Sequence, residues 1–272
     1  MPDALPDMRA IVGDHDLVLI TLDTLRYDAA QACFERGELP VLGPHLPPGG
    51  WERRHTPGSF TYAAHAAFFA GFLPTPASPG PHPRLFALDF EGSETTAANT
   101  YVFRDRADIV SGLRDAGYRT ICIGGVGFFN KRNPLGSQLP GLFDESHWEP
   151  GFGVTAADST ERQVALACAR LRSGELRDTR CFVFINVSAL HQPNRHYLAG
   201  AEHDGYDSHC AALRYVDAAL APLFAALRER GRAFVIACSD HGTAYGEDGY
   251  HGHRLAHEVV MTVPYAHFIL TP

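Results

Sequence analysis

Short, continuously apolar runs constrain the fold of this 272-residue sequence more than any other feature. Continuous rather than alternating apolarity is typical of strands that are covered on both faces, as in a parallel sheet. Three long runs span residues 17–22, 181–187 and 233–238, and a shorter one spans residues 119–123. We therefore expect these segments to be the buried strands of a mainly parallel sheet.

Helical periodicity precedes the last three of these runs, over residues 105–116, 158–171 and 208–230. Asp158, with Glu161 three residues later, has the spacing of a capping box at a helix start. The alternation of helices and strands predicts an α/β sandwich. No repeat or linker interrupts the pattern, so the sequence predicts one domain over residues 1–272.

Three other stretches lack periodicity and are rich in Pro, Gly or Asn, namely residues 39–58, 74–82 and 125–153. We expect them to be loops, and loops of this length in a compact domain are often functional. The first and last of them are the expected determinants of specificity.

Charge and composition exclude several classes of protein. The chain has 31 acidic and 23 basic residues, which argues against nucleic acid as a bulk partner. No apolar run reaches the roughly 18 to 20 residues that span a bilayer, and the acidic N-terminus lacks a signal core. Six scattered cysteines without a CxxC pair read as core residues in a reducing compartment. The sequence predicts a cytoplasmic chain that does not enter a membrane.

Polar residues follow the expected strands. Asp23 comes after the first strand, His191 after the strand ending at residue 187, and Asp240 with His241 after the last. Ligand sites form at the carboxyl ends of parallel strands, and an Asp–His pair offers one oxygen and one nitrogen to a metal. Gly242 would permit the chain to turn there. Taken singly, such an acid is more often a helix cap or an ion-pair member.

A buried helix is expected over residues 63–70, with Ser59 and Thr61 near its start. A hydroxyl there caps the helix in the ordinary case, but the same position places an oxygen where the helix dipole favours an anion. Capping and a nucleophilic role therefore remain open together. Elsewhere, Arg26 and Asp28 are expected to pair locally. Lys131, the only lysine, is either a solvated loop residue or a point charge for a substrate anion.

Four segments, in order, resemble the alkaline phosphatase superfamily and, within it, the sulfatase-like hydrolases. They are LITLDTLRYD, SFTYAAHAAFFAGFLP, FINVSALHQP and CSDHGTAYGEDGYHGH followed by VP. The resemblance implies an α/β/α sandwich with a mainly parallel central sheet. It also implies a nucleophile ten residues before Gly71, which is Thr61. A formylglycine sulfatase would need Cys or Ser there, so Thr61 resembles the phosphodiesterase and phosphoethanolamine-transferase branches.

The resemblance assigns further roles. It implies metal ligation by Asp23, Thr61, Asp240 and His241. His191 and His253 match histidines that contact the transferred group or a second metal. The helix histidine, His65, is an expected substrate-binding residue. Lys131 is a second one, on the strength of its single charge in the loop and not of the resemblance.

The sequence also departs from the family pattern. Ala63 and Ala64 replace the usual Pro-Ser before the helix histidine, Thr243 replaces an acid, and Asn194 replaces a tyrosine. Ala189 stands where a full two-metal site has an acid. The sequence stops shortly after Val263–Pro264, so the usual C-terminal subdomain is expected to be absent. These departures leave the substrate and the number of metals open.

The resulting hypothesis is a metal-dependent hydrolase of a phosphate or sulfate ester, acting through a covalent Thr61 intermediate. A mixed nitrogen and oxygen site suits Zn²⁺ or Mn²⁺, with one ion favoured and a second possible. His191 or His253 would protonate the leaving oxygen of a small anionic ester. The alternatives are a transferase with the same chemistry and a non-catalytic binding subunit. A dimer that covers an exposed sheet edge is possible.

Overall fold

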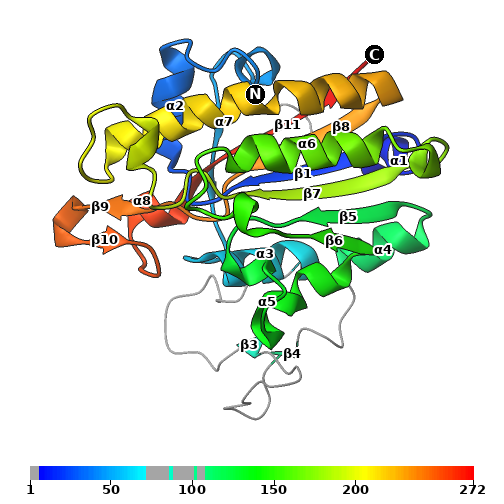
Figure 1. The fold of residues 1–272 in the computed structure, drawn as a ribbon, viewed down its shortest axis with the longest axis horizontal. Coiled ribbons are helices and arrows are strands. Elements are labelled where there is room, and N and C mark those ends of the chain that lie inside the picture. Colours follow the sequence, from blue (N-terminus) through cyan, green and yellow to red (C-terminus); the bar gives the residue numbers. More distant parts are fainter. Residues whose placement is uncertain (1–5, 72–85, 88–100, 103–107) are drawn as a thin grey trace.

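A computed structural model describes residues 6–71, 86–87, 101–102 and 108–272. In these residues the main sheet has seven strands in the spatial order β2-β11-β8-β1-β7-β5-β6 (Figure 1). The five strands from β8 to β6 are parallel, whereas β11 runs antiparallel to both β8 and β2. The strands are β2 (Glu52–His55), β11 (Thr262–Leu270), β8 (Ala233–Cys238), β1 (Asp16–Leu22), β7 (Cys181–Val187), β5 (Arg119–Ile123) and β6 (Glu145–His147).

Helices cover both faces of the sheet. One face carries α2, α6 and α7, and the other carries α3, α4 and α5 (Figure 1). Two short strand pairs, β9–β10 and β3–β4, lie outside the main sheet. The helices are α1 (Met8–Ile11), α2 (Tyr27–Glu35), α3 (Thr61–Ala70), α4 (Ile109–Asp115), α5 (Pro134–Gln138), α6 (Ser159–Leu171), α7 (Tyr206–Arg230) and α8 (Glu258–Met261); the small strands are β3 (Phe86–Ala87), β4 (Tyr101–Val102), β9 (Ala244–Tyr245) and β10 (His251–Gly252).

Two hydrophobic clusters, one on each face of the sheet, explain the continuous apolar runs. In β1, Ile20 and Leu22 belong to the cluster under α6 and α7, whereas Leu17 belongs to the aromatic cluster on the other face. In β7, Val183 likewise belongs to the first cluster and Phe184 to the second. Because successive side chains of a strand point to opposite faces, both faces must be apolar. The α/β/α sandwich with a mainly parallel sheet is confirmed.

The strand predictions are accurate because they rest on this double burial. The strands expected at residues 119–123, 181–187 and 233–238 have those bounds, and the first strand begins one residue earlier, at Asp16. All six cysteines are buried and free. The prediction of a capping box at Asp158 is wrong, although Asp158 does stand at the N-cap of α6. Its carboxylate accepts a hydrogen bond from Arg162 Nε at 2.8 Å and makes no bond to the helix backbone.

Two of the expected loops contain regular structure. The stretch 39–58 includes β2, and the stretch 125–153 includes α5 and β6. The residues of β2 are Glu52-Arg53-Arg54-His55, which carry no apolar signal because β2 is an edge strand facing solvent. The third expected loop, residues 74–82, lies outside the described residues, as do residues 105–107 of the first expected helix.

Helix α7 is, among the described residues, the one helix long and apolar enough to cross a membrane by composition. Its most apolar 18-residue window is 67% buried within the fold, against the sheet and α6. Its apolar character is therefore accounted for by packing.

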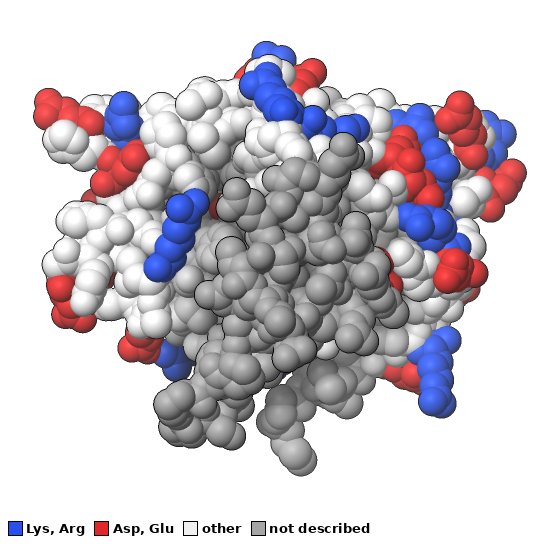
Figure 2. All heavy atoms as spheres, turned by 90° about the horizontal axis from the view of Figure 1, so that it is seen from below, with Lys and Arg blue, Asp and Glu red and all other residues white. Residues whose placement is uncertain are grey.

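Surface charges are mixed in sign. Figure 2 shows Lys and Arg side chains next to Asp and Glu around one face, with no continuous basic area on its described part. Many of the charges form ion pairs, such as Arg114 with Asp144 at 2.7 Å and Arg172 with Glu229 at 2.7 Å. Exposed pairs of this kind contribute little stability, about 0 to 1 kcal/mol each.

Candidate active site

Three metal-ligating side chains converge at the carboxyl ends of β1 and β8. Asp23 follows β1, and Asp240 and His241 follow β8. One ligand atom from each lies within 4.8 Å of the others, and all three residues are fully buried. Because β1 and β8 are adjacent parallel strands, residues more than 200 positions apart in sequence meet at one edge of the sheet.

Thr61 joins this cluster as the first residue of α3. Its Oγ1 donates to Asp23 Oδ2 at 3.3 Å and lies 3.3 Å from His241 Nε2. The residue at the N-cap is Phe60, and no side-chain capping bond is made there. The hydroxyl of Thr61 therefore faces the carboxylate cluster instead of the helix backbone, and of the two hydroxyls Thr61, not Ser59, lines the adjoining cavity.

Each carboxylate of the cluster has one oxygen held by the protein and one without a partner. Asp240 Oδ1 accepts from the backbone of Thr24 at 3.2 Å and of His241 at 3.0 Å. Asp23 Oδ2 accepts from Asn186 Nδ2 at 3.1 Å as well as from Thr61. Asp23 Oδ1 and Asp240 Oδ2 are buried and make no hydrogen bond to the described residues. Buried anionic oxygens of this kind are expensive unless a cation or donor offsets them.

The imidazole of His241 is oriented for ligation. Its Nδ1–H donates to the carbonyl of Gly242 at 2.9 Å, so the neutral ring presents Nε2 to the cluster. Nε2 lies 3.5 Å from Asp240 Oδ2 and 4.0 Å from Asp23 Oδ1. Burial lowers the pKa of His241, which favours this neutral form. Two carboxylate oxygens and one imidazole nitrogen form a donor set that fits Zn²⁺ or Mn²⁺.

The acids of the cluster are strongly perturbed. Burial raises the pKa of Asp240 to about 7. Burial, and then the neighbouring Asp240, raise the pKa of Asp23. Two carboxyls that resist ionisation at one sheet edge are typical of a functional site.

Gly242 is required by close packing. A Cβ at this position would lie 2.0 Å from the carbonyl oxygen of Val259, and its own N–H donates to Val260 at 2.7 Å. We expected Gly242 to permit a turn through its backbone freedom. Its φ is not in the left-handed region, so the glycine is required for space and not for an unusual backbone conformation. The glycine lets the chain after β8 pass against the segment at α8.

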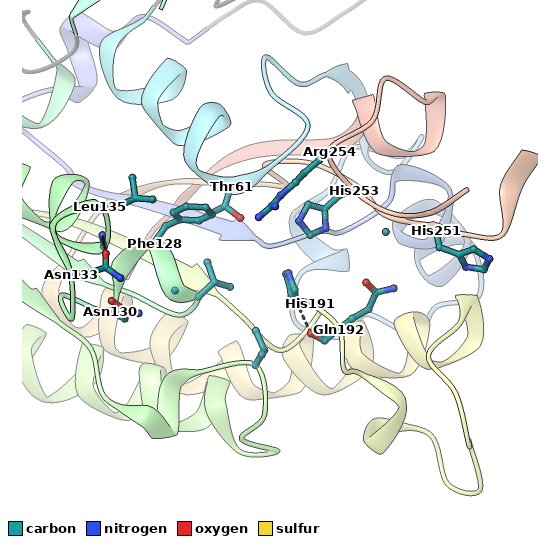
Figure 3. Close-up of a pocket in the computed structure, with 15 residues that line it drawn as sticks. Thr61, Phe128, Asn130, Asn133, Leu135, His191, Gln192, His251, His253 and Arg254 are labelled. Carbon is teal, nitrogen blue, oxygen red and sulfur yellow. Dashed lines mark hydrogen bonds between the residues drawn. The ribbon is translucent and has the colours of Figure 1, made fainter. Parts of the chain in front are cut away.

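A cavity of about 650 Å³ opens beside Thr61 (Figure 3). His191 and His253 line it, with their ring centroids 5.4 Å apart, and the centroid of His253 is 4.6 Å from that of His241. The rings of His241, His253 and His191 therefore lie next to one another in that order, from the carboxylate cluster to the cavity. Burial, followed by the nearby His241, His191 and Arg254, lowers the pKa of His253 to about 3. His253 is therefore neutral at physiological pH.

His65 lies beneath the site and not in the cavity. Its Nδ1–H donates to the carbonyl of Thr61 at 2.7 Å, and its Nε2 is 3.0 Å from the hydroxyl of Thr21. The side chain is fully buried, and burial lowers its pKa to about 3. The structure gives His65 a supporting position, between the start of α3 and β1, in place of the expected substrate contact.

Lys131 also lies apart from the cluster. Its Nζ donates to the carbonyl of Ser146 in β6 at 3.0 Å, and the residue is exposed and absent from the cavity lining. Arg26 and Asp28 pair locally as expected, at 2.6 Å, and Arg26 also contacts Glu247.

Sequence reasoning missed two residues of the site. Asn186 holds Asp23, and its signal was an amide inside the otherwise apolar run 181–187. Arg254 lines the cavity directly after His253. Its position in the sequence carried no periodic signal, because it belongs to a loop folded against the start of α3.

The fold is an α/β/α sandwich in which two acids and a histidine at the strand ends lie beside a hydroxyl at the start of a helix. This combination is typical of the alkaline phosphatase superfamily. Within it, the chain belongs to the sulfatase family, whose family model matches residues 16–265. The resemblance inferred from the four sequence segments is thereby confirmed.

Several solved structures share the fold. The C-terminal periplasmic domain of EcEptC from Escherichia coli, in complex with Zn, has a TM-score of 0.64 and 13% identity, covering 96% of this chain and 74% of that chain. The corresponding domain of the phosphoethanolamine transferase EptC from Campylobacter jejuni has a TM-score of 0.63 and 13% identity, covering 95% and 82%. The lipoteichoic acid synthase LtaP from Listeria monocytogenes has a TM-score of 0.64 and 12% identity, covering 98% and 68%. Curated protein sequences gave no match.

Proposed function

We propose that this protein is a metal-dependent hydrolase of phosphate or sulfate esters that uses Thr61 as its nucleophile. The observation that carries the proposal is the convergence of two unpartnered, buried carboxylate oxygens with His241 Nε2 and Thr61 Oγ1 beside a cavity. Membership of the sulfatase family supports ester chemistry of this kind. The Zn complex of EcEptC supports a divalent cation as the cofactor.

Asp23, Asp240, His241 and Thr61 would hold the cation. When bound, it would lower the pKa of the threonine hydroxyl and neutralise charge on the ester group. Asp23 orients the hydroxyl through the 3.3 Å hydrogen bond, and Asn186 fixes Asp23 in turn. His65 holds the first turn of α3 through the carbonyl of Thr61. The residues around Thr61 thus fix the position of its oxygen before a substrate arrives.

The reaction then divides into two displacements. Thr61, having released its proton to solvent, attacks phosphorus or sulfur, and the bond to the leaving oxygen breaks on the opposite side. The leaving alkoxide takes a proton from His191 Nε2. Water next attacks the Thr61 ester and returns a proton to the same nitrogen, while Thr61 leaves as an alkoxide and takes a proton back from solvent. The threonine hydroxyl is thereby restored and phosphate or sulfate is released.

His191 suits this proton transfer better than His253. Its Nδ1–H donates to the carbonyl of Gln192 at 2.6 Å, which leaves Nε2 free to bind and release a proton. His253, with its pKa lowered to about 3, does not hold the extra proton that a general acid needs. Its role is that of a neutral hydrogen-bonding group or an additional ligand beside His241.

Transfer to an alcohol other than water is the second candidate, favoured by the phosphoethanolamine transferase among the fold neighbours. The same residues would perform both displacements, with the acceptor alcohol replacing water. Turnover in the presence of added alcohols separates the two, since a transferase forms the new ester at the expense of free phosphate.

The first experiment measures bound metal in the purified protein and turnover of p-nitrophenyl phosphate, bis(p-nitrophenyl) phosphate and p-nitrophenyl sulfate. We expect activity that EDTA abolishes and that Zn²⁺ or Mn²⁺ restores. Protein that binds no divalent metal and releases no p-nitrophenol from any of the three would contradict the proposal and favour a non-catalytic binding role.

A further inference from the structure

We propose that Arg254 binds the non-bridging oxygens of the ester group and makes esters with a single negative charge the preferred substrates. This inference rests on the proposed function and adds the residue that recognises the transferred group. Nothing in the family resemblance assigns a role to this position.

Arg254 is fixed to the segment that delivers Thr61. Its backbone N–H donates to the carbonyl of Ser59 at 2.8 Å, and its guanidinium lies over the ring of Phe60, 5.8 Å from the centroid. Residues 59 and 60 immediately precede the nucleophile candidate. The arginine is thus positioned relative to Thr61 Oγ1, although almost 200 residues separate them in sequence.

The backbone at Arg254 is held in an unfavourable conformation. Its φ is +69°, in the left-handed region that non-glycine residues seldom adopt. Such conformations persist where the surrounding contacts impose them, and they cluster at binding and catalytic sites. Here the strained turn, directly after His253, aims the side chain into the cavity toward Thr61 (Figure 3).

Arg254 is the only permanently charged side chain among the described residues that line the cavity. It forms no ion pair with the acids in the described part of the chain, whereas Arg26 and Arg230 are both paired. A planar guanidinium with several N–H donors matches the oxygens of a phosphate or sulfate group.

Charge balance then selects the substrate class. Asp23 and Asp240 would offset the two charges of a divalent cation. Of the described side chains that line the cavity, only Arg254 adds a permanent charge, a single positive one, for the substrate. Sulfate monoesters and phosphodiesters each carry one negative charge, whereas phosphate monoesters carry two at pH 8. The cavity therefore matches the monoanionic esters.

The test compares Arg254→Met and Arg254→Lys with a control, Arg132→Met. Arg132 is an exposed arginine stacked on Trp148, outside the cavity lining, so its removal changes net charge equally. Two quantities are measured: kcat/KM for the three p-nitrophenyl esters, and the Kd of inorganic sulfate by calorimetry on the metal-loaded and metal-free protein. Thermal unfolding of each variant checks that the fold is intact.

We expect Arg254→Met to lower kcat/KM for the monoanionic esters, and to weaken sulfate binding, by about 10- to 100-fold, as for the loss of a charge-assisted hydrogen bond. Arg254→Lys should recover part of both, and Arg132→Met should change neither. Wild-type protein should prefer at least one monoanionic ester over p-nitrophenyl phosphate.

Equal sulfate affinity in Arg254→Met and Arg132→Met would overturn the role of Arg254. A wild-type preference for the phosphate monoester over both monoanions would overturn the substrate class. Failure of the proposed function would look different, because the wild-type protein would then turn over none of the three esters. The Kd of sulfate would still decide whether Arg254 binds the anion.

Discussion

The buried carboxyl of Asp240 allows a test of the metal site that needs no substrate. In Asp240→Asn, the amide oxygen can keep the two hydrogen bonds from the backbone of Thr24 and His241. The oxygen without a partner, Oδ2, becomes an uncharged NH₂ group. The variant therefore removes the buried charge and a metal ligand while leaving the packing nearly unchanged.

The magnitude follows from the raised pKa. Burial moves the pKa of Asp240 from 3.8 to about 7, and a fully buried group with this difference is worth about 4 kcal/mol at about 1.4 kcal/mol per pH unit. Between these pH values the folded metal-free protein keeps a proton that the unfolded chain has released. Its unfolding free energy therefore falls as pH rises from about 4 to about 7, and this loss is complete above pH 7. The amide variant has no such proton.

Denaturant unfolding in EDTA at pH 5 and pH 8 measures the effect. Relative to wild type, Asp240→Asn should be more stable at pH 8 than at pH 5 by about 2.7 kcal/mol, because only the part of the loss between pH 5 and about pH 7 falls inside this window. The buried His209, whose lowered pKa has no contribution from Asp240, titrates alike in both proteins and cancels in the difference. Asp23 acts in the same direction, because Asp240 contributes to its raised pKa. Asp115→Asn, an exposed substitution at the end of α4, controls for the change of side chain.

Added Zn²⁺ should stabilise wild type more than Asp240→Asn, the opposite of the effect of raising the pH in EDTA. A cation at 100 times its Kd stabilises wild type by about 2.7 kcal/mol, and the variant should lose most of this gain. A stability difference between the two proteins that is the same at pH 5 and pH 8, together with equal stabilisation of both by zinc, would refute a cation site formed by two buried carboxyls with raised pKa values.

Three further predictions concern single residues. Thr61→Ala should lower turnover by at least about 10³-fold while Thr61→Ser keeps part of it, and mass spectrometry of a slowly cleaved ester should place the added group on Thr61; an adduct elsewhere would exclude it as nucleophile. Gly242→Ala should destabilise the protein by about 1 to 3 kcal/mol in thermal or denaturant unfolding because its Cβ would meet the Val259 carbonyl, whereas Gly141→Ala, with open space, should stay within about 0.5 kcal/mol. Lys131→Ala should leave KM unchanged, since its Nζ is bound to Ser146 outside the cavity; a raised KM would restore the expected substrate contact.

The strands of the sheet could be read from the sequence because their physical cause is local. A strand covered on both faces needs apolar residues at every position, and this pattern is visible in residues 181–187 without knowing the partners. The edge strand β2 could not be read, because it is defined by its hydrogen bonds to β11 and not by burial. The capping box at Asp158 failed for a related reason, since Arg162 competes for the same carboxylate.

The site was partly determined by sequence. The ends of the expected parallel strands pointed to Asp23, Asp240 and His241, because ligand sites form at the carboxyl edge of such a sheet. The family resemblance added their role as metal ligands and Thr61 as the nucleophile. Only the tertiary structure decided which neighbours serve this set. His65 binds the carbonyl of Thr61 within α3, and Lys131 binds the carbonyl of Ser146 away from the cavity. Arg254 enters the cavity from a turn that is held by Ser59 and Phe60. These contacts depend on how distant loops pack together, which local patterns of polarity do not record.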